Sequence, residues 1–224
     1  MKVLFDHKQK IAEDIYSFYF KSLTPVRYTA GQFIELHIPH PNADERGTKH
    51  WFTLSSSPNE DYLAITTKFS SPSSSFKQAL KKLKPGTELF MADPMGDFVL
   101  PKDPSIPLVF VAGGIGITPY RSMISWLTSQ NEQRNIVVIY AAKKKTQLAF
   151  LPLLKQYNLK LIEHTDDSLT AETILSLSKP QPNSLLIYLS GPEPMIEALV
   201  EQFKSSAHDM SKIVTDYFPG YTVL

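Results

Sequence analysis

The alternation of apolar and polar residues changes character about halfway along the chain. The first hundred residues hold short runs with a period of two, and residues 33–38 (FIELHI) are the clearest, with an aliphatic residue at every second position from Ile34 to Ile38. Such alternation predicts strands with one buried face. Further β-branched or aromatic runs lie at residues 14–20, 62–69 and 87–93. Short strands separated by turn signals predict a small antiparallel β-barrel of the Greek-key kind.

One segment of this first half follows a helical period instead. In residues 74–86, apolar side chains recur every three or four positions from Phe76 to Leu83. Ser75 can cap the first turn, and Pro85 with Gly86 stops the helix. We therefore expect one short helix within the barrel half.

Beyond the proline-rich residues 100–107 (LPKDPSIP), strands alternate with helices. We place a domain boundary there, which divides residues 1–102 from residues 103–224. Strands are expected at residues 108–112, 135–141, 159–164, 184–190 and 212–218, and helices at residues 118–130, 147–157, 170–178 and 193–204. This alternation predicts a parallel, doubly wound sheet with helices on both faces.

Composition narrows the class of protein. A chain of 224 residues that is 42% hydrophobic can form two cores, and Lys+Arg 23 against Asp+Glu 22 gives no global field that would attract nucleic acid or an anionic membrane. No run approaches the roughly 20 apolar residues of a membrane span, and no leader pattern is evident, so we expect a soluble cytoplasmic protein. With no cysteine, disulfides and thiolate-held clusters are excluded, and we assign no metal site. Redox chemistry would need a borrowed cofactor.

The turn after the first apolar strand of the second half carries the most specific chemistry. Gly113, Gly114 and Gly116 precede Thr118, a candidate N-cap, and Pro119, a candidate first helical residue. Such a turn lets backbone approach a ligand closely and aims N–H groups at an anion such as a pyrophosphate. The spacing is not G-x-G-x-x-G, so an ordinary strand-to-helix turn is an alternative interpretation. Its position in the first βα unit favours ligand binding.

Four motifs, in order, resemble the ferredoxin:NADP reductase superfamily of flavoproteins over nearly the whole chain. They are Gly31-Gln32-Phe33, the aromatic and hydroxyl segment at residues 50–56, the GGxGxTP turn at residues 113–119, and SGPEPM at residues 190–195. The resemblance implies a flavin-binding barrel followed by a nucleotide-binding α/β domain. FAD is the expected flavin, because the family most often uses it.

In the first flavin segment, the resemblance implies that Phe52 packs on the isoalloxazine ring and that the Thr53 hydroxyl bonds flavin N5. Without it, Phe52 would be interpreted as a core residue and Thr53 as an ordinary strand threonine. His50 stands where an arginine pairs with the flavin phosphate. Since imidazole is mostly neutral at pH 7, Arg46 or Lys49 could supply the charge.

The remaining positions assigned to the flavin flank this segment or lie at a second one. They are Trp51, Leu54 and Ser55 beside Phe52, and Thr67, Lys68, Ser74, Ser75 and Phe76 between a strand end and a helix start. Backbone N–H groups at that helix start could hold the pyrophosphate. Trp51 is expected to point to the opposite face of its strand from Phe52.

A lysine run follows the second strand of the α/β half. Lys143 and Lys144, continued by Lys145, would favour the 2′-phosphate of NADP(H), whereas an acidic residue there would favour NAD. A solubilising charge run is an equally weighted alternative.

The resemblance also assigns residues to the nicotinamide. Ser190 replaces the cysteine that the family usually has just before Gly191 and Pro192. Asp216 corresponds to an acidic residue that could relay protons or orient the nicotinamide, and either Phe218 or Tyr217 corresponds to an aromatic that covers the flavin.

These assignments imply a flavin-dependent oxidoreductase that transfers hydride from NADPH to FAD and then single electrons to a separate carrier protein, such as ferredoxin or flavodoxin. One alternative is an NADH-dependent reductase that serves a cytochrome, an oxygenase or a membrane redox complex. The other is a subunit that binds flavin or nucleotide without catalysis.

Overall fold

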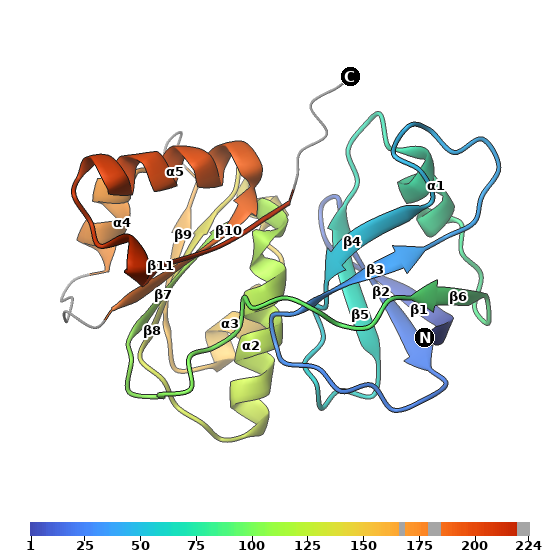
Figure 1. The fold of residues 1–224 in the computed structure, drawn as a ribbon, viewed down its shortest axis with the longest axis horizontal. Coiled ribbons are helices and arrows are strands. Elements are labelled where there is room, and N and C mark those ends of the chain that lie inside the picture. Colours follow the sequence, from blue (N-terminus) through green and yellow to red (C-terminus); the bar gives the residue numbers. More distant parts are fainter. Residues whose placement is uncertain (166–168, 179–184, 219–224) are drawn as a thin grey trace.

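The computed structural model describes residues 1–165, 169–178 and 185–218, which form two sheets side by side with one helix, α2, at their junction (Figure 1). The first sheet contains β1 (Lys2–Ala12), β2 (Ile15–Ser22), β3 (Phe33–His37), β4 (Lys49–Thr53), β5 (Leu63–Lys68) and β6 (Glu88–Met91), with α1 (Ser75–Lys81) between β5 and β6 in the chain. The second contains β7 (Leu108–Gly113), β8 (Ile136–Ala141), β9 (Lys160–His164), β10 (Leu186–Pro192) and β11 (Ile213–Phe218).

The first sheet is an antiparallel barrel, as predicted. Its strand order is β4-β3-β6-β1-β2-β5, and its two edges meet where Leu54, just past β4, bridges Ile65 of β5. This bridge brings the two edges of the sheet together at the end of β4. Ile34 and Leu36 of β3 are fully buried, which confirms the predicted inward face. The sequence reasoning missed β1, in which only the first few residues alternate.

The second sheet is parallel, with the order β11-β10-β7-β8-β9, and helices cover both its faces. The helices are α2 (Thr118–Ser129), α3 (Leu151–Gln156), α4 (Ala171–Leu177) and α5 (Glu193–Ser205). Side chains of α4 and α5 pack in one core cluster, and those of α2 and α3 in another. The second cluster also contains Ile15, Ala30 and Phe98 from the barrel half, so this core runs across the junction. The predicted doubly wound arrangement is confirmed.

Two predicted helix caps are wrong by one residue. A 3-10 turn, Gly114–Ile117, precedes α2, so Ile117 is the N-cap, Thr118 the first helical residue and Pro119 the second. At α1, the hydroxyl of Ser74, and not that of Ser75, accepts the hydrogen bond from Lys77 N at 3.2 Å. A 3-10 turn ahead of α2 and the choice of capping serine at α1 account for the two differences.

The predicted helix at residues 147–157 is shorter than expected. A 3-10 turn, Lys145–Gln147, lies ahead of it, and α3 begins only at Leu151 because Phe150 adopts a left-handed conformation with φ 62°. Pro152 then occupies the first turn of α3, where a missing N–H costs nothing.

The chain passes from β6 to β7 through residues 92–107, and the division between residues 102 and 103 stays a prediction. Within the described ranges, no helix is both long enough and apolar enough to cross a membrane.

Gly31 fixes one contact across the junction. Its φ is +105°, and a Cβ atom there would lie 2.1 Å from the carbonyl oxygen of Phe98 and 2.6 Å from Cε of Met123 on α2. Gly86 shares a positive φ, +84°, but a Cβ atom there would meet nothing within 4 Å. The two glycines therefore share a similar backbone requirement and differ in packing.

We predict that Gly31→Ala destabilises the protein more than Gly86→Ala. Each substitution incurs about 1–2 kcal/mol for a left-handed alanine. Gly31→Ala adds an overpacking cost of about 1–3 kcal/mol, since the nearest atom is backbone and cannot rotate away. Urea denaturation followed by circular dichroism measures the free energy of unfolding. Equal losses in the two variants would contradict the close contact at Gly31.

Candidate functional site

The carboxyl ends of β7 and β10 form the topological switch point of the parallel sheet. From β7 the chain passes through α2 to β8 on one side, while β10 lies on the other side of β7. Open α/β sheets bind ligands in the crevice outside the strand ends at such a point. The residues at these two ends are Gly113, followed by the 3-10 turn, and Ser190 to Pro192.

Gly116 packs closely against the backbone of β10, and Gly113 lies against a side chain of α5. A Cβ atom on Gly116 would lie 2.1 Å from the carbonyl oxygen of Ser190, and one on Gly113 would lie 2.5 Å from Sδ of Met195. Gly114 differs, because its φ is +54° and a Cβ atom there would meet nothing within 4 Å. The turn is thus held against Ser190 and Gly191, and Gly114 borders open space where a ligand could approach.

The 3-10 turn leads directly into α2, so the combined segment has the positive end of a helix at Gly114. The first N–H groups of a helix have no partner within it and can bind an anion. Thr118 and Pro119 are buried, and the Thr118 hydroxyl donates to Ile115 O at 3.1 Å. These two residues shape the turn from inside.

Ser190 and Asp216 lie side by side at the same strand ends. They are register partners in the parallel pairing of β10 and β11, and Ser190 Oγ donates to Asp216 Oδ2 at 3.5 Å. Burial raises the pKa of Asp216 to about 6, which the hydrogen bond from Ser190 only partly opposes. Asp216 can therefore exchange a proton near neutral pH. Phe218 ends β11, and its side chain lies outside the described part of the structure.

The lysine segment follows β8, near the other carboxyl ends of the sheet. Lys143, Lys144 and Lys145 are exposed. Lys144 Nζ lies 3.9 Å from a carboxylate oxygen of Glu13, in the turn between β1 and β2, and the Thr146 hydroxyl also donates to this carboxylate. The segment thus contacts the barrel half, and an acid offsets part of its positive charge.

On the barrel side, β4 carries the proposed flavin residues on two faces. His50 and Phe52 are register partners of the buried Leu36 and Ile34, and both rings pack near Phe76 of α1, with centroids 4.2 Å and 5.9 Å away. Phe52 and Thr53, being adjacent in a strand, point to opposite faces. A flat ring that contacts both must lie across the end of β4.

Trp51 lies on the opposite face from Phe52, as strand alternation requires. Its side chain is half-exposed and meets Phe33 edge to face, with ring centroids 5.4 Å apart. Leu54, in contrast, is fully buried in the barrel core. Any contact of Leu54 with a flavin would use its backbone.

His50 is not a source of positive charge. Burial, and after it the charge of the nearby Lys77, lower its pKa to about 4, so the imidazole is neutral at pH 7. Lys49 points away and pairs with Glu35 at 3.5 Å. The cations near His50 are Lys77 and Arg46, which both act electrostatically on its ring.

The start of α1 gathers these cations. Lys77 Nζ donates to the carbonyl oxygen of Lys68 at 2.8 Å, and burial together with the charges of Arg46 and Lys68 lowers the pKa of Lys77. Mutual repulsion among cations favours an anion beside them. The resident acid is Asp44, whose Oδ2 accepts from Ser75 N at 2.8 Å. A flavin phosphate fits the charge of this region, although Asp44 already uses the N–H of Ser75.

The serines after β4 were expected to offer polar contacts to a cofactor, but their hydroxyl groups are used within the protein. Ser55 Oγ lies 2.8 Å from Thr66 Oγ1, and Ser56 Oγ accepts from Ala64 N at 2.9 Å. Thr67 is likewise buried in β5. The backbone N–H of Ser55 also donates to Ala64 O at 2.8 Å, so both its hydroxyl and its N–H have partners within the barrel.

The carbonyl groups of these serines join the barrel to α2. Arg121 Nη1 donates to Ser55 O at 2.7 Å, and Ser122 Oγ donates to Ser56 O at 2.5 Å. Sequence reasoning missed both donors, because single positions on an amphipathic helix carry no signal of what they face. These bonds place the end of β4 beside the first turn of α2, so the flavin segment and the glycine turn lie on either side of one junction.

The comparisons agree with this arrangement. Residues 110–201 match the family model described as the oxidoreductase NAD-binding domain. Flavohemoprotein A of Dictyostelium discoideum is 26% identical over 244 residues, which cover 97% of this chain and 60% of the relative, so the chain spans little more than half of that protein.

Two solved structures share the fold. One is phthalate dioxygenase reductase, described as a modular structure for electron transfer from pyridine nucleotides to [2Fe-2S]. It superposes with a TM-score of 0.80 at 20% identity, and the match covers 100% of this chain and 69% of the reductase chain. The other is ferredoxin-NADP+ reductase from Plasmodium falciparum, which gives a TM-score of 0.78 at 18% identity. The match covers 97% of this chain and 95% of the reductase chain. These likenesses show the fold, a barrel followed by a parallel α/β sheet, and the second half of the chain matches the oxidoreductase NAD-binding domain.

Proposed function

We propose that this chain is a flavin-dependent reductase module that takes hydride from NADPH onto FAD and passes electrons singly to a separate carrier protein, such as ferredoxin or flavodoxin. The observation that carries the proposal is the pair of bonds from Arg121 and Ser122 to Ser55 and Ser56. They hold the end of β4 next to the turn at the switch point of the parallel sheet. A flavin and a nicotinamide bound at these two places would meet at the junction.

The chain's own residues would then bind, orient and exchange protons. The bound flavin would supply the redox chemistry, accepting two electrons with hydride and releasing them one at a time. Phe52 and Thr53 would border the ring across the end of β4, and Lys77 with Arg46 would attract the phosphate. Gly114 would admit the nucleotide pyrophosphate to the start of the helix.

Ser190 and Asp216 would act at the nicotinamide end. The Ser190 hydroxyl can donate to Asp216, and a carboxyl group with a pKa of about 6 can hold or release a proton at working pH. The absence of cysteine means that no thiol of this chain takes part. The proposed catalytic residues are therefore Thr53, Ser190 and Asp216.

One observation favours a second candidate, an NADH-dependent reductase of the oxygenase-reductase kind. Glu13 lies against the lysine segment, with its carboxylate 3.9 Å from Lys144 Nζ and in contact with Thr146. Neutralisation of Lys144 would weaken the preference for a 2′-phosphate. In this candidate the electrons pass to an oxygenase component or a cytochrome.

Reconstitution tests the function directly. The purified protein should bind FAD with a yellow absorption band, and NADPH added without oxygen should bleach it. Ferricyanide reduction should be faster with NADPH than with NADH at equal concentration. The proposal fails if the protein stays colourless with both FAD and FMN, or if neither nicotinamide bleaches a bound flavin.

Charge reversal tests the nucleotide preference. Lys143→Glu with Lys144→Glu should lower kcat/KM for NADPH by about tenfold or more, which corresponds to about 1.4 kcal/mol, and should change the value for NADH little. Lys84→Glu, an exposed lysine in the barrel half, is the matched control. Equal loss with both nucleotides would assign the lysines to general charge attraction instead.

The pKa of Asp216 predicts a dependence of stability on pH. Because its folded pKa of about 6 lies above the ordinary 3.8, the folded state binds the proton more tightly, and the parent loses stability as pH rises from about 4 to 6. Asp216→Asn lacks this proton. The stability of this variant relative to the parent should therefore rise between pH 4.5 and pH 7.5 in urea denaturation of the apoprotein.

The exposed Asp93 provides the control for this measurement. Asp93→Asn should show no comparable rise between the two pH values. A flat difference for Asp216→Asn would mean that Asp216 remains charged throughout this range and cannot serve as the proposed proton carrier.

A further inference from the structure

Arg121, in the first turn of α2, contacts two segments that are far apart in the sequence, residues 55–60 and Phe150. Its Nη1 atom donates to Ser55 O at 2.7 Å and pairs with Glu60 Oε1 at 2.5 Å. On its other side, the centre of the guanidinium group lies 5.7 Å from the centroid of the Phe150 ring. The planar guanidinium suits this combination of fork-like donors and a stacking face.

Residues of the barrel half and of α2 both bind the carboxylate of Glu60. Besides Arg121, its Oε1 accepts from Ser57 N at 3.0 Å, within the barrel half, and from Ser125 Oγ at 3.0 Å, on α2. The side chains of Arg121 and Glu60 are 15% and 27% exposed. Water and salt therefore screen this pair less than a surface pair, and each partner left alone would lose its neutralising charge.

Phe150 reaches Arg121 through an unusual backbone. Its φ is 62°, a left-handed conformation that a bulky residue rarely adopts. Phe150 is also the last residue before α3 and follows the lysine segment within a few residues. The cation–π contact therefore links the end of that segment to the same guanidinium that bonds Ser55.

We propose that Arg121 is a positioning residue that fixes the glycine turn and the lysine segment relative to the flavin strand. Ser55 lies two residues beyond Thr53, and Arg121 lies five residues beyond Gly116. The guanidinium thus sets the distance between the two proposed cofactor sites. Hydride transfer needs the reacting atoms within about 3–3.5 Å, so this distance would affect the rate of transfer. That consequence rests on the proposed function.

The first test measures the geometry without any cofactor. The chain has no cysteine, so Lys84→Cys in the barrel half and Glu197→Cys on α5, both exposed, can carry two spin labels without background. Double electron–electron resonance should give a narrow distance distribution in the parent. Arg121→Met should broaden or shift it, and Arg121→Lys should do so less, because lysine keeps the charge but not the fork.

Lys204→Met is the matched control, because Lys204 forms an exposed pair with Glu201 at 2.7 Å on α5. It should leave the distribution unchanged. Should Arg121→Met fail to fold, Glu60→Gln replaces it, since this change removes the charge and keeps the shape. A distribution in Arg121→Met, or in its replacement, that matches the parent would overturn the proposal.

The second test uses the FAD-loaded protein. In Arg121→Met the rate constant of flavin bleaching by NADPH should fall by about 10- to 100-fold, as expected for a small misplacement of reacting groups. The Kd for FAD should change by less than about threefold, because Arg121 lies outside the proposed flavin contacts. An unchanged bleaching rate would contradict the positioning role.

The two tests separate this proposal from the proposed function. If the parent binds no flavin, the proposed function fails, and the spin-label distances still decide whether Arg121 fixes the junction. If the parent is active and the distances in Arg121→Met do not change, the positioning role fails and the function stands.

Discussion

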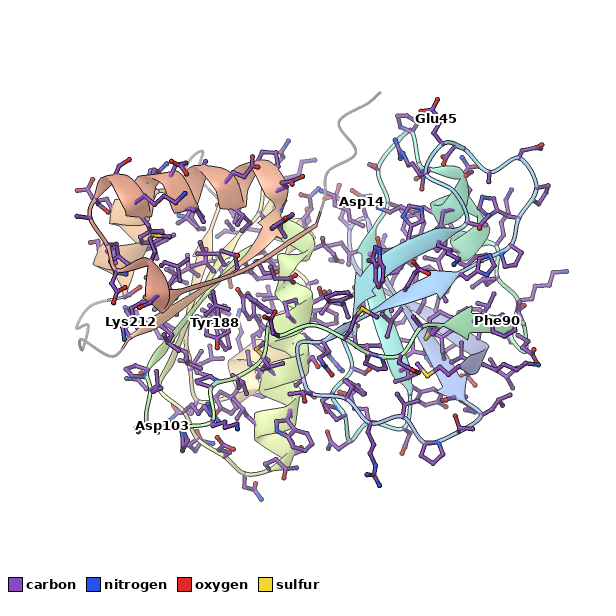
Figure 2. The ribbon with its side chains drawn as sticks, viewed as in Figure 1. Asp14, Glu45, Phe90, Asp103, Tyr188 and Lys212 are labelled. Carbon is purple, nitrogen blue, oxygen red and sulfur yellow. The ribbon has the colours of Figure 1, made fainter. Side chains whose placement is uncertain are left out.

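Three consecutive residues at the start of α2 join the two sheets, and the rest of the structure depends on them. The Tyr120 hydroxyl donates to Val111 O on β7 at 3.1 Å and to Tyr188 O on β10 at 2.9 Å. Arg121 and Ser122 face the other way and donate to Ser55 O and Ser56 O. Figure 2 labels Tyr188 within the parallel-sheet half, on the far side of α2 from the barrel. One helical turn is thus bonded to both sheets.

The periodic elements of the fold could be predicted from the sequence because burial imposes a period. The aliphatic alternation in β3 and the continuous apolar run of β7 each specify a strand that the structure confirms. The local choices at helix ends could not be predicted in the same way. Whether Ser74 or Ser75 caps α1 depends on Asp44, which lies thirty residues away in the chain and binds Ser75 N.

In the candidate site, too, the features set by residue type could be predicted, and those set by contacts distant in the chain could not. The glycine turn was found from its residue types, since close packing against Ser190 admits only glycine at position 116. The hydroxyl groups of Ser55 and Ser56 contact β5, which the residue types alone do not reveal, because a serine hydroxyl suits a cofactor and a neighbouring strand equally well. Arg121 and Glu60 were missed altogether. A single charged residue in a helix or loop has no periodicity to distinguish a junction from a solvated surface.

The charges around α1 explain how a flavin site could do without the family's arginine. With His50 neutral, the positive charge beside its ring comes from Lys77 on a helix and Arg46 in a loop. Asp44 already accepts from Ser75 N, and the Ser75 hydroxyl accepts from Asp44 N at 3.0 Å, so this carboxylate is held at the start of α1. A phosphate entering here would have to displace Asp44 or bind beside it. The affinity for the flavin would therefore depend on how firmly residues 40–48 hold that carboxylate in place, and less on the residue at position 50.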